Sequence, residues 1–119
     1  MNIKERLLSL PSEIEELKLN LIEKQNSFQM LQEKMKFWSL YELDLISSEV
    51  DEKGKPKFSN DTKRQAELQR RKDESNEYRA LEIEAEKLEK EVAILNVKLD
   101  KLYNEQSNLR AICRLEGRD

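Results

Sequence analysis

The chain has little of what compact domains and most enzymes need. Its 119 residues include two glycines, two prolines, one cysteine and no histidine, and 6% of them are aromatic. Turns draw on glycine and proline, so this composition allows roughly one or two chain reversals. Without histidine, a catalytic triad, an imidazole proton shuttle and the common zinc sites all lack a central group. We therefore predict neither an ordinary compact domain nor a histidine-dependent enzyme.

Long apolar runs and paired cysteines are lacking as well. No apolar stretch approaches the roughly 18 residues of a membrane span. Charged residues interrupt positions 1–8, where a signal peptide would be apolar. A lone cysteine forms no internal disulfide, which fits a reducing compartment. The sequence thus predicts a cytoplasmic protein without membrane contact.

What the chain does have is charge, on 39% of its residues, and a regular spacing of apolar side chains. In the second half they recur at alternating steps of three and four, the seam pattern of a coiled coil. The seam positions are Tyr78, Leu81, Ala85, Leu88, Val92, Leu95, Leu99, Leu102, Gln106, Leu109 and Cys113. Because neither glycine nor proline interrupts residues 62–116, we predict one long helix there, ended by Gly117.

The first half repeats this pattern less regularly. Its seam positions are Ile14, Leu17, Leu21, Phe28, Leu31, Met35, Trp38 and Leu45, with Lys24 and Glu42 as polar intrusions. After Pro11, the segment from Ser12 to Glu15 has the form of a capping box, which marks a helix start. We therefore predict a helix over 12–48. Residues 1–10 form either a short separate helix or part of the same helix, kinked at Pro11.

The one obvious turn lies between the two halves, at residues 49–61. Gly54 and Pro56 break the helical pattern, and Ser59 or Asn60 is suited to cap the next helix. A very short β-hairpin is the alternative to an irregular loop. The fold prediction is all-α: a single domain, 1–119, forming a long antiparallel helical hairpin with a short N-terminal helix. In this two-helix coiled coil, the heptad register places side by side those residues of the two helices whose numbers add up to about 112.

Apolar residues outside the seam form a second stripe. They are Ile83, Ile94, Val97 and Ile112 in the second half, and Leu19, Ile22, Met30, Phe37, Leu40, Leu43 and Ile46 in the first. A second stripe on a hairpin predicts a homo-oligomer, and we favour a dimer packed as a helical bundle. The alternative is that the N-terminal segment folds back over part of the stripe.

Charge is distributed very unevenly along the chain. Residues 53–72 carry a net charge of +6, whereas residues 1–52 carry −5 and residues 73–119 carry −4. A basic hairpin tip with an aromatic residue is typical of a nucleic-acid contact, although lysines around a turn also serve solubility. The candidate nucleic-acid-binding residues are Lys53, Lys55, Lys57, Phe58, Lys63, Arg64, Arg70, Arg71 and Lys72. Two pairs seven residues apart, Lys63 with Arg70 and Arg64 with Arg71, are predicted to share one helix face.

Other candidates for chemistry have simpler interpretations. Cys113 lies on the seam and is suited to fill space, because no base is available to activate its thiol. The carboxylates of the second half have helical spacing but no histidine to complete a metal site. Two glycines cannot build a phosphate-binding loop. We predict a protein that is not an enzyme and that uses no metal or cofactor.

The most distinctive part of the sequence is its centre. It reads Gly54-Lys-Pro-Lys-Phe-Ser-Asn-Asp-Thr-Lys-Arg-Gln-Ala-Glu-Leu68, followed by Tyr78 and by leucine heptads that end at residues 108–112. This combination resembles small coiled-coil proteins encoded in phages and prophages of Gram-positive bacteria, near recombination and single-strand-annealing genes. The resemblance covers most of the chain and implies a bacterial host cell as the setting, without an established activity.

Two functional hypotheses follow. The first is an accessory protein of phage DNA replication or recombination that contacts nucleic acid through the basic tip, since lysines and arginines there can neutralise phosphates. The second is a protein-interaction module that inhibits or scaffolds a host nuclease or defence complex, or another host or phage protein. Its motivation is the second apolar stripe beside an acidic shaft, which offers a helical groove to a partner.

Overall fold

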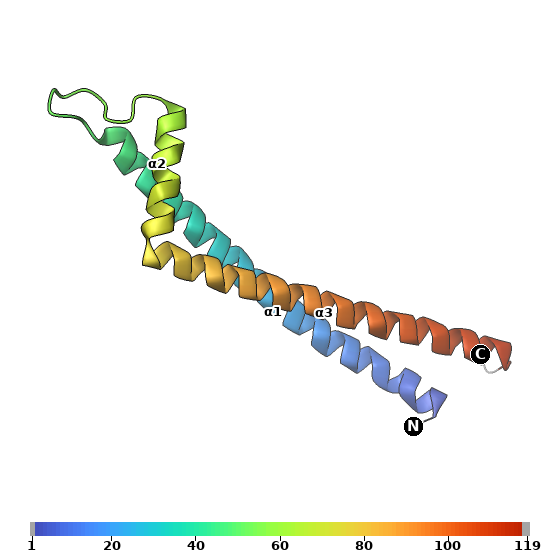
Figure 1. Cartoon of the computed structure of the whole chain (residues 1–119). Helices are drawn as coiled ribbons and strands as arrows, with labels where there is room; N and C mark the ends of the chain where they lie inside the picture. Colours follow the sequence, from blue (N-terminus) through green and yellow to red (C-terminus); the bar gives the residue numbers. More distant parts are fainter. Residues whose placement is uncertain (1, 118–119) are drawn as a thin grey trace. The chain divides into compact units, whose positions relative to one another are not determined.

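The computed structural model describes residues 2–117, and these fold into three helices: α1 (Ile3–Ser48), α2 (Asp61–Glu74) and α3 (Asn76–Leu115) (Figure 1). α1 and α3 run antiparallel, because Arg6 near the start of α1 pairs with Glu105 near the end of α3. The predicted all-α helical hairpin is therefore confirmed. None of these helices is both long and apolar enough to cross a membrane.

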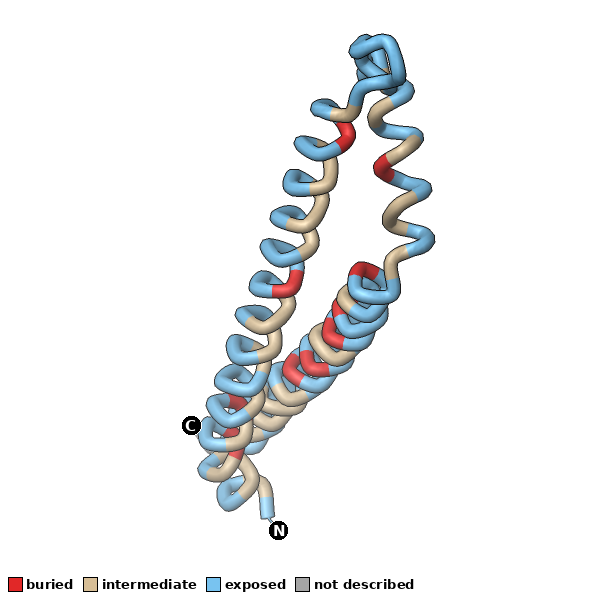
Figure 2. The backbone as a smooth tube through the Cα atoms, turned by 90° about the vertical axis from the view of Figure 1, so that its left-hand side faces the viewer, coloured by how far each residue is buried: buried red, intermediate tan, exposed pale blue. Residues whose placement is uncertain are grey.

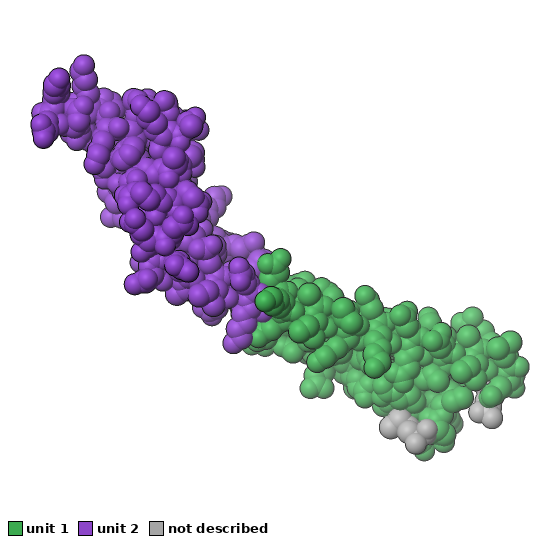
Figure 3. All heavy atoms as spheres, viewed as in Figure 1, with its two compact units in different colours: residues 1–27, 88–119 green, residues 28–87 purple. Residues whose placement is uncertain are grey.

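The hairpin divides into two compact units (Figure 3). Unit 1 combines the chain up to residue 27 with the chain from residue 88 onward, and unit 2 comprises residues 28–87. α1 and α3 contribute to both units, whereas the turn and α2 belong to unit 2.

The core of unit 1 follows the predicted seam from Ile14 onward and extends it toward the N-terminus through Leu7 and Leu10. Leu10, Ile14 and Leu99 are buried together. The partly buried residues packed against them are Leu7, Leu17, Leu21, Leu102 and Leu109. This apolar contact on one face of each helix is what the three–four spacing requires. At the margin, the Arg6 guanidinium contacts Glu105 at 2.6 Å, and Lys24 Nζ contacts Glu91 at 3.1 Å. Both pairs fit the predicted register.

Of the two alternatives for residues 1–10, the structure has the one in which they belong to the same helix. α1 runs without interruption from Ile3 to Ser48, so the separate helix over 1–10 and the helix start at Ser12 are wrong. Proline removes one backbone donor and crowds the carbonyl four residues earlier. Here that cost is offset by packing, because Leu10 and Ile14 on either side of the proline are buried against α3, while Pro11 itself is exposed.

This arrangement makes Pro11→Ala a stabilising substitution. Alanine restores a helical N–H donor and removes the clash, which stabilises the folded state by up to ~3 kcal/mol. The unfolded chain also gains conformational freedom when proline is replaced, which opposes this gain by ~1 kcal/mol. We expect the free energy of unfolding to rise by about 1–2 kcal/mol, as measured by urea denaturation. A loss of stability would contradict this prediction. It would mean that the ring of Pro11 contributes to packing although the residue is exposed.

Unit 2 is built from the end of α1, the turn, α2 and the start of α3. Its buried apolar side chains are Leu31, Ile46, Leu68, Tyr78 and Ala85. The rings of Trp38 and Tyr78 lie 4.8 Å apart, so Trp38 of α1 packs on the first seam residue of α3. The end of the first seam is corrected, because Ile46 is fully buried whereas Leu45 is 40% exposed.

The predicted single helix over 62–116 is in fact two helices. Ser75 separates α2 from α3 with an extended backbone, φ −84° and ψ 116°. Its N–H donates to the Lys72 carbonyl and closes α2, while its hydroxyl accepts the Tyr78 N–H and caps α3. A serine side chain offers this alternative to a helical hydrogen bond, so a helix can end without glycine or proline.

The turn is held by short-range hydrogen bonds. Val50 and Pro56 form one isolated antiparallel bridge. This single bridge is the part of the predicted β-hairpin alternative that the structure contains. Gly54 has φ +77°, a conformation in which side chains with a Cβ are strained. The Asn60 side chain accepts the Lys63 N–H at 2.8 Å, which confirms Asn60 as the cap of α2. Most of the turn residues are exposed (Figure 2).

The C-terminal end of the second long helix lies beside Gly117, as the sequence predicted. α3 ends at Leu115, and Gly117 follows with φ +70°. Its N–H donates to the Arg114 carbonyl at 3.1 Å, which satisfies one of the open carbonyls at the helix end.

Candidate nucleic-acid interface

The turn presents its lysines outward because Asp51 occupies its centre. One carboxylate oxygen of Asp51 accepts the backbone N–H groups of Lys53 and Lys55 at 2.9 and 3.0 Å. The Asp51 N–H in turn donates to the Lys55 carbonyl at 2.8 Å. The side chains of Lys53 and Lys55 are exposed, and they form no ion pair with any residue from 2 to 117. Their charges are therefore available to an external anion.

A shallow concavity lies where the turn meets α2. It has a volume of about 400 Å³ and is lined by Lys57, Phe58, Lys63, Ala66, Glu67 and Arg70. Lys57 Nζ lies 5.8 Å from the centroid of the Phe58 ring and 4.0 Å from Glu49. Lys63 is exposed and has no ion-pair partner in the described part of the chain. Three cationic side chains, one carboxylate and an aromatic ring thus border one hollow.

Arg70 faces the same hollow but is paired within α2. Its guanidinium contacts both carboxylate oxygens of Glu67, at 2.6 and 2.8 Å, and also Glu74 at 2.8 Å. These are the three- and four-residue spacings at which helical side chains meet. The pairing raises the pKa of Arg70, chiefly through its hydrogen bond to Glu67. Arg70 therefore contributes less net positive charge than the composition suggested.

Arg71 is turned toward α1 and joins three acidic residues. Its guanidinium contacts Glu49 at 2.6 Å, Glu67 at 3.0 Å and Glu42 at 3.3 Å. The side chain is 19% exposed. These hydrogen bonds, the one to Glu49 above all, raise the pKa of Arg71. Arg71 thus connects α2 to α1 and is a structural residue of unit 2.

Two further predicted residues are also occupied internally. Arg64 Nε donates to the Phe58 carbonyl at 3.2 Å, which fastens the end of the turn to α2. Lys72 Nζ lies 5.2 Å from the centroid of the Tyr78 ring. The predicted basic face of α2 is consequently divided: Lys63 and Arg70 are exposed, whereas Arg64 and Arg71 are half-buried.

Glu67 is the acidic residue that lines the hollow, and its two carboxylate oxygens accept hydrogen bonds from Arg70 and Arg71. The Arg70 guanidinium, with help from Arg71, lowers the pKa of Glu67 to about 2 against the opposing effect of desolvation. Glu67 therefore stays ionised and paired at neutral pH. It adds little repulsion toward an anion bound beside Lys63.

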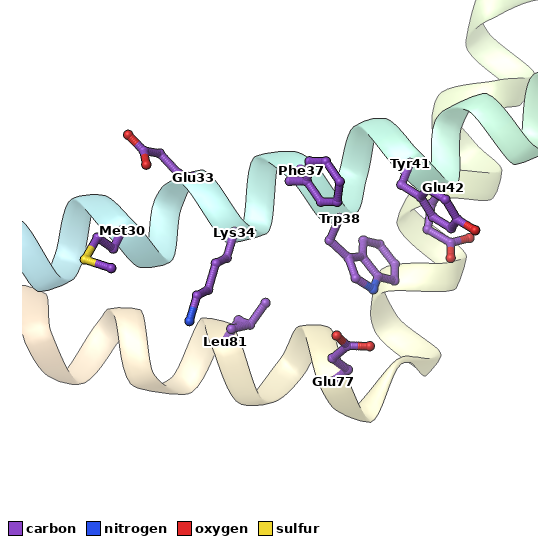
Figure 4. A pocket seen from close by; sticks show the side chains of 9 residues that line it. All are labelled: Met30, Glu33, Lys34, Phe37, Trp38, Tyr41, Glu42, Glu77 and Leu81. Atoms are coloured by element: carbon purple, nitrogen blue, oxygen red, sulfur yellow. The ribbon is translucent and has the colours of Figure 1, made fainter.

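The sequence interpretation missed a groove in unit 2 (Figure 4). It has a volume of about 930 Å³, and its lining residues are Met30, Glu33, Lys34, Phe37, Trp38, Tyr41, Glu42, Glu77 and Leu81. Trp38 points from α1 toward the start of α3, while Phe37 and Tyr41 remain exposed beside it. The off-seam residues Met30 and Phe37 were the available signal, but their proximity to Leu81 depends on how α1 and α3 pack.

Comparisons with protein-family models, curated proteins and solved structures found no match to this chain. Residues 2–117 contain no group of three or more acidic or cysteine side chains placed to hold a metal ion.

Proposed function

We propose that this protein contacts nucleic acid through the exposed lysines of its turn and of the start of α2, and that it has an accessory, non-enzymatic role in DNA replication or recombination. The binding surface consists of Lys53, Lys55, Lys57 and Lys63, with Phe58 beside them. Lysines neutralise backbone phosphates without reading sequence, so binding would be largely sequence-independent. The resemblance to phage-encoded coiled-coil proteins supports the replication or recombination setting.

The observation that carries this proposal is the contrast between acids and lysines at the turn. Asp51 is engaged by backbone N–H groups, and Glu49 and Glu67 are engaged by Arg71. Lys53, Lys55 and Lys63, in contrast, have no acidic partner among the described residues. These three lysines outnumber the two exposed acidic residues there that have no such contact, Glu52 and Asp61. The Phe58 ring borders the hollow beside Lys57 and Lys63, where an unpaired base could stack.

The first test is fluorescence anisotropy with labelled single-stranded and duplex DNA. If about three phosphates are neutralised, affinity should fall roughly twenty- to fortyfold as salt rises from about 50 to about 200 mM. Reversing three charges, in K53E/K55E/K63E, should abolish binding while leaving the helical circular dichroism spectrum unchanged. Phe58→Ala should weaken binding of the single strand more than binding of the duplex.

A matched control separates the turn from general electrostatics. K4E/K36E/R79E makes the same change in net charge at exposed residues that have no ion-pair partner within residues 2–117. It should keep most of the affinity of the unmodified protein. Equal losses in the two triple variants, or no binding at low salt, would contradict the proposal.

A second candidate, a protein-interaction module, is favoured by the groove of unit 2. Met30, Phe37 and Tyr41 expose most of their apolar surface there, and Glu33, Glu42 and Glu77 stand along its margin with Lys34 as the single cation. The groove is suited to a basic amphipathic helix. Its use would be recognised by substitutions at Phe37 that impair function without affecting DNA binding.

A further inference from the structure

α1 carries an apolar and acidic face outside its seam with α3. In unit 2, Met30, Glu33 and Phe37 of this face also line the groove that reaches Glu77 and Leu81 of α3. In unit 1, Leu19 lies two residues from both Leu17 and Leu21, which pack in the core, and two residues correspond to about 200° around a helix. Leu19 and Ile22 are accordingly exposed. The face continues at steps of three or four through Glu15, Leu19, Ile22, Asn26, Met30, Glu33, Phe37, Leu40 and Asp44, with Glu23 beside it. We name this set the α1 outer face.

α3 carries the electrostatic opposite. Val97 lies two residues from both Leu95 and Leu99, which are buried, and is 67% exposed. Steps of three and four define the α3 outer face as Ile83, Lys87, Lys90, Ile94, Val97 and Lys101. Its charged members are all basic, whereas those of the α1 outer face are all acidic. Opposite charges border both faces: Lys18, Lys34 and Lys36 on α1, and Glu86 and Asp100 on α3.

The charges on both faces are exposed, and none of them has an ion-pair partner within residues 2–117. The same arrangement is found in each unit taken alone. In unit 1, Glu15 and Glu23 lie on the α1 side, and Lys90 and Lys101 lie on the α3 side. In unit 2, Glu33 and Asp44 on α1 match Lys87 on α3.

Like charges decide which faces can meet. Two α1 outer faces would place carboxylates together, and two α3 outer faces would place ammonium groups together, which destabilises either contact. An α1 face against an α3 face pairs opposite charges around apolar side chains. We propose that the α1 outer face of one copy of this chain binds the α3 outer face of a second copy.

This contact is heterologous, because each copy uses two different surfaces. In unit 1 the two faces lie on opposite sides of the helix pair, so one copy can hold two neighbours at once. Such contacts form a ring where the rotation closes and an open filament where it does not. The proposal thus replaces the symmetric dimer favoured by the sequence, and it does not depend on the proposed nucleic-acid contact.

The experiment uses two variants that each block one face. M30S/F37S removes exposed apolar groups of the α1 outer face, and I94S/V97S removes those of the α3 outer face. Light scattering coupled to size exclusion should show the mass of the unmodified protein rising with concentration beyond two chains, and falling with added salt. Each variant alone should have the mass of one chain. Their equimolar mixture should double to two chains and stop there.

The control is Val50→Ser, an exposed apolar residue of the turn that should leave association unchanged. A mixture of blocked variants that stops at one copy of each is expected only from a heterologous contact. The proposal is overturned if the unmodified protein stays monomeric at every concentration, which would leave the groove to another protein. The proposal is equally overturned if association of the unmodified protein stops at two chains, or if either blocked variant alone forms a homodimer.

Discussion

Leu10→Ala is expected to lower the free energy of unfolding by about 3 kcal/mol, within the range measured for leucine truncation in protein cores. Leu10 is fully buried, and it packs with Ile14 and Leu99 in unit 1. Alanine loses the transfer energy of the removed methyl groups and leaves a cavity between two helices. Because small proteins are stable by only about 5–15 kcal/mol, the loss should be evident as a lower denaturation midpoint in urea.

Leu8 supplies the matched control on the same turn of α1. Its side chain is 72% exposed, so Leu8→Ala should change stability by less than about 0.5 kcal/mol. Both variants are best compared at a protein concentration low enough to prevent association. If the two substitutions cost the same, Leu10 would not occupy the core position described for it.

The fold could be predicted from the sequence wherever one pattern decided it. Every seam position from Tyr78 to Cys113 is buried or half-buried, because the three–four spacing alone defines one face of a helix. The errors fall where packing overrides a local signal, or where a local cap acts without glycine or proline. At Pro11 packing of Leu10 and Ile14 overrides the proline, and at Ser75 a side-chain cap ends a helix that has no glycine or proline.

The candidate site was predictable only in part. The turn lysines followed from composition, and the pairing of Glu67 with Arg70 follows from three-residue helical spacing. The partners of Arg71 do not, because Glu42 and Glu49 lie 29 and 22 residues away along the chain. A charge count therefore included Arg71 in a basic surface, although the fold directs it into an acidic cluster. Which cations remain available depends on tertiary contacts.

Arg71→Met is the second substitution with a large expected effect. Methionine keeps most of the apolar stem but removes the guanidinium that joins Glu42, Glu49 and Glu67. At pH 7 three carboxylates would then face one another without their shared cation. We expect the free energy of unfolding to fall by about 2 kcal/mol, the typical cost of removing hydrogen bonds to charged groups. Arg70→Met is the control and should cost less, because Arg70 is 55% exposed and its partners lie on its own helix.

The pH dependence of stability tests the same network independently. In the folded protein the pKa of Glu67 is lowered from 4.5 to about 2, chiefly by Arg70 and further by Arg71. A carboxyl with a lowered folded pKa stabilises fully above its unfolded pKa, and the stabilisation disappears as pH falls from about 4.5 toward 2. The unmodified protein should therefore lose stability over this range in urea titrations. Arg71→Met should lose less over this range, since Arg71 no longer helps to lower the pKa of Glu67, so the two proteins should converge in stability as the pH falls. A difference that stays constant from pH 7 to pH 2 would show that Arg71 acts through packing of its stem and not through its charge.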